Sequence, residues 1–243
     1  MKVVAIIPAR YQSTRFPGKP LADICGKPMI WWVYQQCLKV KGLSDVIVAT
    51  ESEKIVEVCK KYGIDAMLTS DLCTSGTERT AEVAQSVKSD AYVVVMGDEP
   101  LVSPDNISLV VEDLAANSQN YDAVMLCKKF DNGVDVINNT TIKLAINDSK
   151  ELIYMSRATI PYPKAMLNYD LYKNIGVYGF KKEALEYYRT TSRGILEKIE
   201  DCEMLRMIEN HKIVKTIEVD SESMSVDTYK DLERIRQHIS SIS

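Results

Sequence analysis

The sequence predicts an α/β fold with a mainly parallel sheet, helices on both faces and a small antiparallel lobe. Apolar, β-branched runs alternate with helical patterns through the first half of the chain, which is typical of βα units. The second half is less regular and contains a pair of short strands joined by a turn. At 243 residues the chain is long enough for a sizeable core, and it has no long linker or internal repeat. We therefore predict one domain over residues 1–243, with the lobe at about 123–190.

Strands and helices alternate in the predicted first half. The opening run Val3 to Ile7 is apolar throughout, as in a strand that is buried on both faces. Ser52 is a suitable N-cap for the second helix, Gly63 stands where a C-terminal glycine belongs, and Thr77 is the expected cap of the third helix. The predicted strands are 3–7, 45–50, 66–68 and 91–95, and the predicted helices are 28–40, 52–62, 78–87 and 104–116.

The second half is predicted to contain four strands and two helices. A turn at Asn147-Asp148 separates two of these strands, and the segment 131–139 is polar and loop-like. The predicted strands are 123–128, 142–146, 152–155 and 175–180, and the predicted helices are 195–209 and 228–239.

Bulk composition excludes several classes of function. A net charge of −4 and a pI near 5.4 argue against a general nucleic-acid binder. No uninterrupted apolar stretch is long enough to span a membrane, and the N-terminus lacks the layout of a signal peptide, so we expect a cytosolic protein. The six cysteines contain no C-x-x-C pair, and neither His211 nor His238 lies near a cysteine pair, so we expect reduced thiols and no zinc site.

The loop after the first strand holds three cations. Pro8 ends the apolar run, and Arg10, Arg15 and Lys19 follow within one turn-rich segment that contains Gly18. Open α/β sheets bind ligands just beyond the carboxyl ends of their strands, and fixed cations there suit a polyanion such as a triphosphate. The segment contains neither the P-loop pattern nor the dinucleotide-binding glycine pattern.

Two aspartates are candidate metal ligands. Asp98 follows the most apolar strand, and Gly97 before it permits close backbone approach. An acid at that edge of the sheet is well placed to hold Mg²⁺ against a triphosphate, although Asp98 could also simply cap the next turn. Asp227 could supply a second carboxylate, or serve only as the N-cap of the last helix.

Two further segments are candidates for substrate contact. Ser75-Gly76 leads into a helix whose free N–H groups could meet a base edge or a phosphate, and Arg79 could reach a carbonyl oxygen of a pyrimidine. The alternative is a capped helix with a surface arginine. Arg157 lies between a strand and a proline-limited turn, where it could clamp a carboxylate or phosphate of an acceptor or be an exposed structural residue.

These motifs together resemble the CMP-KDO synthetases, also called 3-deoxy-manno-octulosonate cytidylyltransferases, over nearly the whole chain. The matching segments, in family order, are Ile-Pro-Ala-Arg-Tyr-x-Ser-Thr-Arg-x-Pro-Gly-Lys-Pro-Leu at 7–21, Gly-Lys-Pro-Met at 26–29, Ser-Gly-Thr-Glu-Arg at 75–79, Gly-Asp-Glu-Pro at 97–100, Ser-Arg-Ala-Thr-Ile-Pro at 156–161, Ile-Gly-Val-Tyr at 175–178 and Val-Asp-Thr at 226–228. The resemblance implies a Rossmann-like nucleotidyltransferase fold, Mg²⁺ dependence and a homodimer. It also implies transfer of CMP from CTP to an acidic acceptor, KDO or a related ulosonic acid, with release of pyrophosphate.

The resemblance also implies roles for individual residues. CTP would be bound by Pro8, Ala9, Arg10, Arg15, Lys19, Ser75, Gly76 and Arg79, and Mg²⁺ by Asp98 and Asp227. Arg10, Lys19 and Asp98 would be catalytic. The acceptor would be bound by Met96, Tyr154, Arg157 and Asn174, and the lobe would also supply dimer contacts.

Two positions depart from the family pattern. The family usually has Gln before Gly-Asp-Glu-Pro and His before the Ile-Gly-Ile-Tyr strand, whereas this chain has Met96 and Asn174. Both positions are understood to face the sugar acid, and replacing Gln by Met removes a donor and an acceptor. The alternative is therefore a cytidylyltransferase that acts on an acceptor other than KDO, such as a phosphorylated small acid of a capsule or surface-glycan pathway. A second class of function is a binding or regulatory protein that does not turn over substrate. The presence of Lys19, Asp98 and Asp227 argues against it, because a protein that only binds does not need a full metal site.

Overall fold

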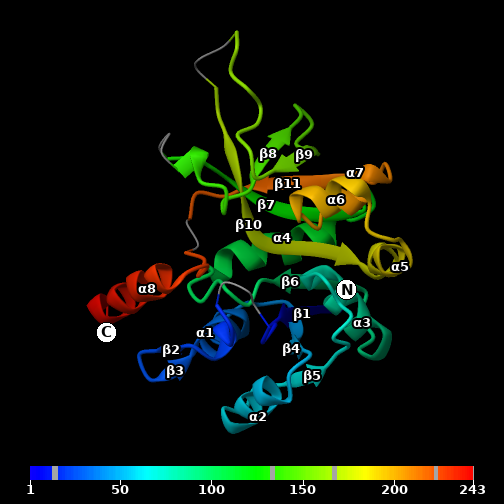
Figure 1. The fold of residues 1–243 in the computed structure, drawn as a ribbon. Coiled ribbons are helices and arrows are strands. Elements are labelled where there is room, and N and C mark those ends of the chain that lie inside the picture. Colours follow the sequence, from blue (N-terminus) through cyan, green and yellow to red (C-terminus); the bar gives the residue numbers. More distant parts are fainter. Residues whose placement is uncertain (13–15, 132–134, 166–168, 222–223, 243) are drawn as a thin grey trace.

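A mixed sheet forms the centre of the computed structural model (Figure 1). The structure describes residues 1–12, 16–131, 135–165, 169–221 and 224–242, and within these ranges the sheet has nine strands. Its main path is β11-β7-β10-β6-β1-β4-β5; off this path, β8 pairs with β10 and β9 pairs with β8. The strands are β1 Val3–Pro8, β4 Leu43–Thr50, β5 Ala66–Leu68, β6 Ala91–Val95, β7 Ala123–Lys129, β8 Lys143–Ile146, β9 Leu152–Ser156, β10 Tyr172–Lys181 and β11 Val214–Glu218; a separate hairpin pairs β2 Asp23–Ile24 with β3 Lys27–Pro28.

The first half of the chain forms parallel βα units, as predicted. β1 pairs in parallel with β4 and β6, and β4 pairs in parallel with β5. The helices are α1 Met29–Leu38, α2 Glu53–Lys61, α3 Gly76–Ser86, α4 Pro104–Asn117, α5 Lys182–Thr190, α6 Ile195–Glu200, α7 Leu205–Glu209 and α8 Tyr229–Ile242, with 3-10 turns η1 Lys19–Leu21 and η2 Asp135–Ile137. No helix among the described residues is long and apolar enough to cross a membrane.

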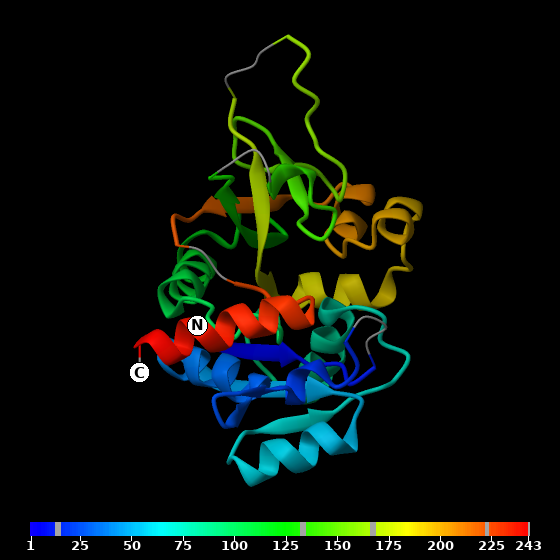
Figure 2. The same cartoon turned by 60° about the vertical axis from the view of Figure 1, so that its left-hand side comes forward.

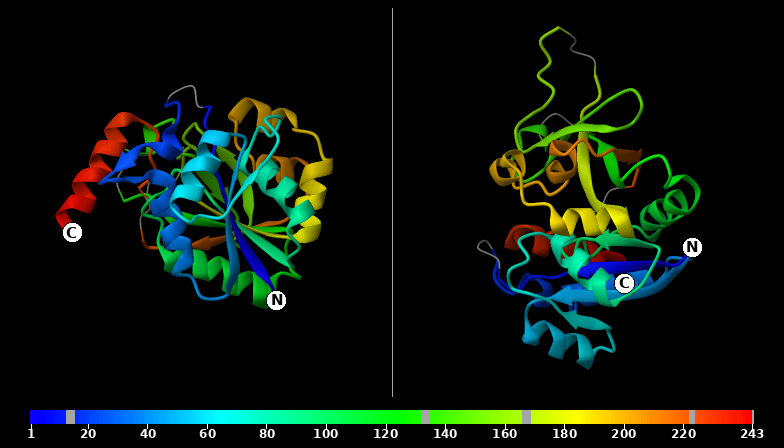
Figure 3. Two further views of the ribbon diagram at one scale, coloured as in Figure 1. Left: turned by 90° about the horizontal axis from the view of Figure 1, so that it is seen from below. Right: turned by 90° about the vertical axis from the view of Figure 1, so that its right-hand side faces the viewer.

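Helices cover both faces of the sheet, and the alternation of side chains along β1 shows why its sequence is apolar throughout. Ala5 and Ile7 pack with residues of α1, α2 and α4 on one face, whereas Val4 and Ile6 pack with residues of α3, α5 and α7 on the other. All four side chains are fully buried. The views in Figures 2 and 3 show these two helical layers on either side of the strands. The predicted α/β class is confirmed.

The strand β10 joins the parallel part of the sheet to the antiparallel lobe. It runs antiparallel to β6 through Val177–Lys181 and antiparallel to β8 through Tyr172 and Lys173. The hairpin of β8 and β9 is the predicted antiparallel pair. β10 is four residues longer than the predicted 175–180, because its polar first three residues pair with β7 and β8 and its last residue, Lys181, pairs with β6.

Several local predictions are wrong for identifiable reasons. The predicted helix 195–209 is two short helices, because Asp201 takes a left-handed conformation (φ +51°) between α6 and α7. The carboxylate of Glu209 then accepts hydrogen bonds from two backbone N–H groups at the start of α6. Ser75, rather than Thr77, caps α3 by accepting a hydrogen bond from the N–H of Glu78. The loop 131–139 contains the turn η2, and α5 and β11 were not predicted.

Candidate functional site

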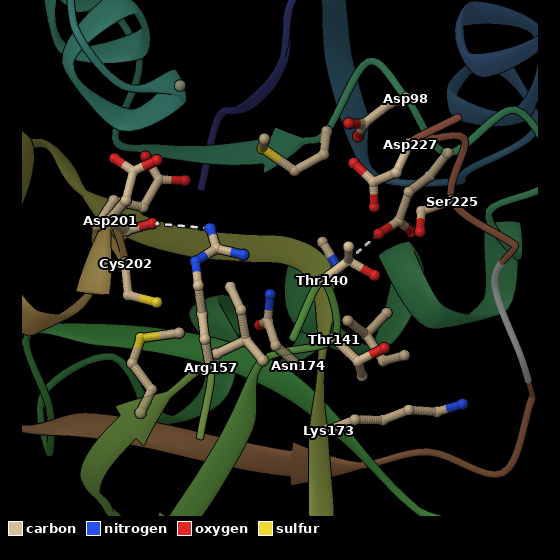
Figure 4. Close-up of a pocket in the computed structure, with 18 of the residues that line it drawn as sticks. Asp98, Thr140, Thr141, Arg157, Lys173, Asn174, Asp201, Cys202, Ser225 and Asp227 are labelled. Carbon is tan, nitrogen blue, oxygen red and sulfur yellow. Dashed lines mark hydrogen bonds between the residues drawn. The ribbon is translucent and has the colours of Figure 1, made fainter. Parts of the chain in front are cut away.

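A cavity of about 530 Å³ opens between the carboxyl ends of β1 and β6 and the lobe that contains β8–β10 (Figure 4). It is lined by many of the residues singled out in the sequence: Arg10, Ser75, Gly76, Met96, Asp98, Arg157, Asn174 and Asp227. Asp98 and Asp227 lie side by side at one end, and Arg157 lies across the cavity beside Asp201 (Figure 4). The topology therefore gathers residues from all three thirds of the chain around one space.

Lys19 connects the two aspartates. Its Nζ atom donates to Asp98 Oδ2 at 2.7 Å and to the carbonyl of Val226 at 2.8 Å, and it lies 4.0 Å from Asp227 Oδ1. The three side chains are about one-sixth to one-quarter exposed, so solvent screens this contact only partly. The two carboxylates supply oxygen donors of the kind that a divalent ion prefers, and Lys19 neutralises part of their charge.

Close backbone packing brings Asp98 to this position. A Cβ atom on Gly97 would lie 2.6 Å from the carbonyl oxygen of Pro8, so only glycine permits the end of β6 to approach the end of β1 so closely. The carbonyl of Asp98 also accepts a hydrogen bond from the N–H of Val226 at 2.9 Å. This bond joins the end of β6 to the segment that precedes α8.

Asp227 is not the N-cap of the last helix. The N–H of Thr228 donates to Asp231 Oδ2 at 2.8 Å, and the N–H of Asp231 donates back to Thr228 Oγ1 at 3.3 Å. This reciprocal capping box satisfies the start of α8 without the carboxylate of Asp227. The carboxylate of Asp227 faces the cavity near Lys19 instead, so the capping alternative is wrong.

The start of the phosphate-binding candidate loop is anchored on the sheet. Pro8 and Ala9 are buried, and the N–H of Ala9 donates to the carbonyl of Ala49 at 2.8 Å, which extends the pairing of β1 with β4. Arg10 is exposed and donates from Nη1 to the carbonyl of Thr74 at 3.3 Å. Arg15 lies outside the described residues.

The helix α3 begins against this loop. A Cβ atom on Gly76 would lie 3.0 Å from the ring of Pro8 and 3.3 Å from Met96 Sδ, so Gly76 keeps the helix start close to the ends of β1 and β6. Ser75 uses its hydroxyl to cap the helix. Both residues line the cavity, as expected of a segment that meets a ligand.

Arg79 does not lie where the sequence predicted. Its side chain is 1% exposed and does not line the cavity; it contacts Thr69, the carbonyl of Ser70 at 3.3 Å and the carboxylate of Glu51 at 3.3 Å. The prediction that Arg79 reads the base is corrected, because one helical turn after Ser75 the chain has already entered the interior.

Arg157 forms the opposite wall of the cavity. Its guanidinium donates to three backbone carbonyls, those of Glu200 (2.9 Å), Asn139 (3.3 Å) and Asp201 (3.3 Å). The side chain is therefore half-buried and fixed in direction while its positive charge is paired with no carboxylate in these contacts. Arg157 is thus half-buried rather than exposed, and its bonds to three backbone carbonyls agree with the structural alternative as well as with a place in the cavity wall.

Tyr154 does not line the cavity. It is next to Met155 on β9, and adjacent residues of a strand point to opposite faces. Met155 is the one that lines the cavity, which places Tyr154 on the other side. The predicted contact of Tyr154 with an acceptor is therefore corrected.

Met96 and Asn174, the two departures from the family pattern, face the same cavity. Asn174 Nδ2 donates to the hydroxyl of Tyr178 at 2.8 Å, and burial raises the pKa of Tyr178 well above its ordinary value, so this hydroxyl stays protonated. The Oδ1 atom of Asn174 is buried and has no hydrogen-bond partner among the described residues. Such an atom is an acceptor to which a ligand or a water can donate.

Sequence reasoning missed part of the cavity wall. Thr140 and Thr141 come from the segment before β8, Lys173 from β10, and Glu203 from the turn between α6 and α7. Burial raises the pKa of the Glu203 carboxyl, which accepts a hydrogen bond from the N–H of Thr77 at the start of α3. No motif marks these residues, because their placement around the cavity depends on the tertiary fold.

Comparison with known proteins agrees with this geometry. The cytidylyltransferase family profile matches residues 4–217. A 3-deoxy-manno-octulosonate cytidylyltransferase from Photobacterium profundum is 40% identical over 97% of this chain and 98% of its own, and one from Escherichia coli is 33% identical over 97% and 95%. The solved structure of a CMP:2-keto-3-deoxy-manno-octonic acid synthetase complexed with CTP superposes with a TM-score of 0.93, at 32% identity and full coverage of both chains. The chain therefore belongs to the cytidylyltransferase family of CTP-dependent nucleotidyltransferases.

Proposed function

We propose that the protein transfers CMP from CTP to 3-deoxy-manno-octulosonate (KDO) or a related ulosonic acid and releases pyrophosphate. The names of the full-length relatives support this acceptor class. The observation that carries the proposal is the convergence of Lys19, Asp98 and Asp227 at one end of the cavity, opposite the fixed cation Arg157. One end suits a triphosphate and a divalent ion, and the other suits the carboxylate of a sugar acid.

In the proposed reaction, Arg10, Arg15 and Lys19 bind the triphosphate. An oxygen of the acceptor attacks the α-phosphorus, the bond to the bridging oxygen breaks, and pyrophosphate leaves in line with the attack. The cations neutralise the negative charge that grows on the leaving group. No covalent intermediate with the protein is required.

Magnesium is part of this proposal. The donor set fits it, because two carboxylates from different segments come within 2.7 Å and 4.0 Å of the same Lys19 Nζ and the remaining ligands would be phosphate oxygens. When bound by Asp98 and Asp227, the ion would polarise the phosphate and lower the pKa of an attacking hydroxyl.

The residues at the acceptor end of the cavity bear on the choice between two candidate acceptors. For an ulosonic acid, Arg157 would bind the carboxylate and Asn174 Oδ1 would accept a hydrogen bond from a hydroxyl. Met96, however, offers neither donor nor acceptor where it lines the cavity, and this favours as the second candidate a phosphorylated small acid with fewer hydroxyl groups. A phosphate acceptor is already ionised, so it would need no general base.

We also propose that the protein works as a homodimer in the cytosol. All six cysteines are free thiols, which suits a reducing compartment. The lobe at 123–190 would supply the acceptor contacts and the dimer contacts, and its exposed Ile153 and Tyr162 are apolar residues that suit an interface. Light scattering on the purified chain tests this: a mass near 27 kDa, that of one chain, would contradict the dimer.

Pyrophosphate release with CTP tests the proposed reaction. The acceptor panel contains KDO, its amino analogue, other ulosonic acids and phosphorylated small acids. We expect turnover with at least one sugar acid, loss of turnover in EDTA, and recovery with added Mg²⁺. Turnover confined to a phosphorylated acid would replace KDO by the second candidate, and binding of CTP without turnover on any acceptor would contradict the enzyme assignment.

A further inference from the structure

A buried ion pair lies beneath the loop that carries the phosphate-binding candidates. The carboxylate of Glu51, at the end of β4, lies 3.3 Å from the guanidinium of Arg79 on α3. Their side chains are 9% and 1% exposed. Burying two charges is costly, and removing one partner would leave the other charge buried and uncompensated, so the two side chains are coupled to one another.

The other oxygen of Glu51 holds the loop. Glu51 Oε1 accepts hydrogen bonds from the backbone N–H groups of Tyr11 at 2.8 Å and Gln12 at 3.3 Å, immediately after Arg10. The carbonyl of Tyr11 in turn accepts a hydrogen bond from the N–H of Gly18 at 2.8 Å, immediately before Lys19. Glu51 therefore holds Tyr11 at the start of the loop, and Tyr11 in turn holds Gly18 at its end.

Gly18 makes this closure possible. Its backbone is left-handed (φ +71°), and a Cβ atom there would lie 3.4 Å from the ring of Tyr11. The ring thus packs directly against the returning end of the loop. Arg10 adds a second tie through its bond to the carbonyl of Thr74, in the segment that leads to α3.

We propose that Arg79 and Glu51 are positioning residues that hold the two described ends of the phosphate-binding loop, at Tyr11–Gln12 and at Gly18. Arg79 orients the carboxylate of Glu51, Glu51 holds Tyr11, and Tyr11 holds Gly18, so that Arg10 and Lys19 stand at fixed positions at the end of the cavity. Arg79 acts on the phosphates through this series of contacts, without touching the base. The inference rests on the proposed function, since it assumes that this loop binds the triphosphate.

Ligands with and without a base distinguish this role from base recognition. We would measure binding of inorganic pyrophosphate, CMP, CTP and UTP by calorimetry to the wild type and to the R79M, R79K and E51Q variants. Pyrophosphate and CTP should bind R79M and E51Q about tenfold to a hundredfold more weakly, as for other supports of binding groups, and CMP should change much less. R79K should bind better than R79M because it keeps the charge. The E51Q/R79M double variant should lose less than the sum of the two, because both act through one path.

The matched control is K215M, which breaks a partly buried ion pair with Asp113 that lies away from the loop. It should bind pyrophosphate as the wild type does.

Unchanged pyrophosphate binding in R79M with reduced preference for CTP over UTP would show that Arg79 reads the base, and an equal loss for all ligands would show a merely structural role. If R79M does not fold, R79K and E51Q decide between the same outcomes. A wild type that binds neither CTP nor pyrophosphate would contradict the proposed function itself, whereas variants that bind like a competent wild type would contradict only this inference.

Discussion

The substitution Arg206→Met removes the most heavily bonded buried cation that the structure describes. The Arg206 side chain is 2% exposed, and it donates to both oxygens of Glu197 (2.7 and 2.8 Å), to Glu78 (2.6 Å) and to the carbonyls of Tyr188 (3.1 Å) and Thr191 (3.2 Å). Glu197 is fully buried, and after the substitution the cation that remains paired with it among the described residues would be Arg193, at 3.2 Å. The variant should therefore be strongly destabilised.

The size of the effect follows from the loss of one partner of a buried pair. Breaking such a pair costs about 3–5 kcal/mol, because the remaining charge stays desolvated. For a chain of this length each kcal/mol lowers the melting temperature by about 2–4 °C, so Arg206→Met should lower it by about 6–20 °C. The double substitution Glu197→Leu with Arg206→Met removes both charges and should recover much of this loss.

Thermal unfolding followed by circular dichroism measures these differences. The matched control is Arg189→Met, which removes an exposed pair with Glu186 and should hardly change the melting temperature. A fall of less than about 3 °C in Arg206→Met, equal to that of the control, would refute the reasoning, because it would mean that the carboxylate of Glu197 is neutral or solvated in the folded protein.

Three further predictions concern the site. Asp98→Asn should lower kcat about a hundredfold or more in pyrophosphate release while CTP binding measured by calorimetry persists; a loss of binding equal to the loss of turnover would contradict a role in the transition state. Met96→Gln with Asn174→His should raise kcat/KM for KDO, because the pair restores polar partners in the acceptor half; no gain in a folded double variant would show that these positions do not set acceptor choice. Lys143 is fully buried and donates to three carbonyls, including that of Arg157 at 2.7 Å. Lys143→Met should therefore raise the KM of the acceptor about tenfold and leave the KM of CTP nearly unchanged. Equal changes in both KM values would refute a local effect.

The parallel half of the fold was accessible from the sequence because its signals are local. The run Val3 to Ile7 is apolar at every position since helices cover both faces of the sheet, and the helix after Ser52 ends where Gly63 takes a left-handed conformation. The position of Asp98 was predictable for the same reason, because a carboxylate directly after a buried strand lies at the edge of the sheet.

The remaining features depend on contacts between distant segments. The periodicity of 195–209 predicts one helix, but Glu209 folds back to cap α6 and the chain reverses at Asp201, which no local pattern indicates. Arg79 follows a motif that meets the cavity, yet Glu51, 28 residues earlier in the sequence, draws its guanidinium into the interior. Tyr154 and Met155 are adjacent on β9 and lie on its opposite faces. A shift of the strand register by one residue would exchange the one that lines the cavity for the other.

The path of β10 has a consequence for how the two ends of the cavity evolve and move. One continuous strand pairs with β8 at its start and with β6 at its end, and its register shifts between Ile175 and Tyr178, where the N–H of Gly176 donates to Glu99 at 2.8 Å. The spacing between the end of the strand beside β8 and the end beside β6 is thus set by one continuous backbone and its ladder hydrogen bonds. Asn174, before the shift, pairs with β7 rather than with β6, and its side chain donates to the hydroxyl of Tyr178 on the part of the strand beside β6. A scaffold of this kind can adopt new acceptors by local substitution while the chemistry at its other end stays the same.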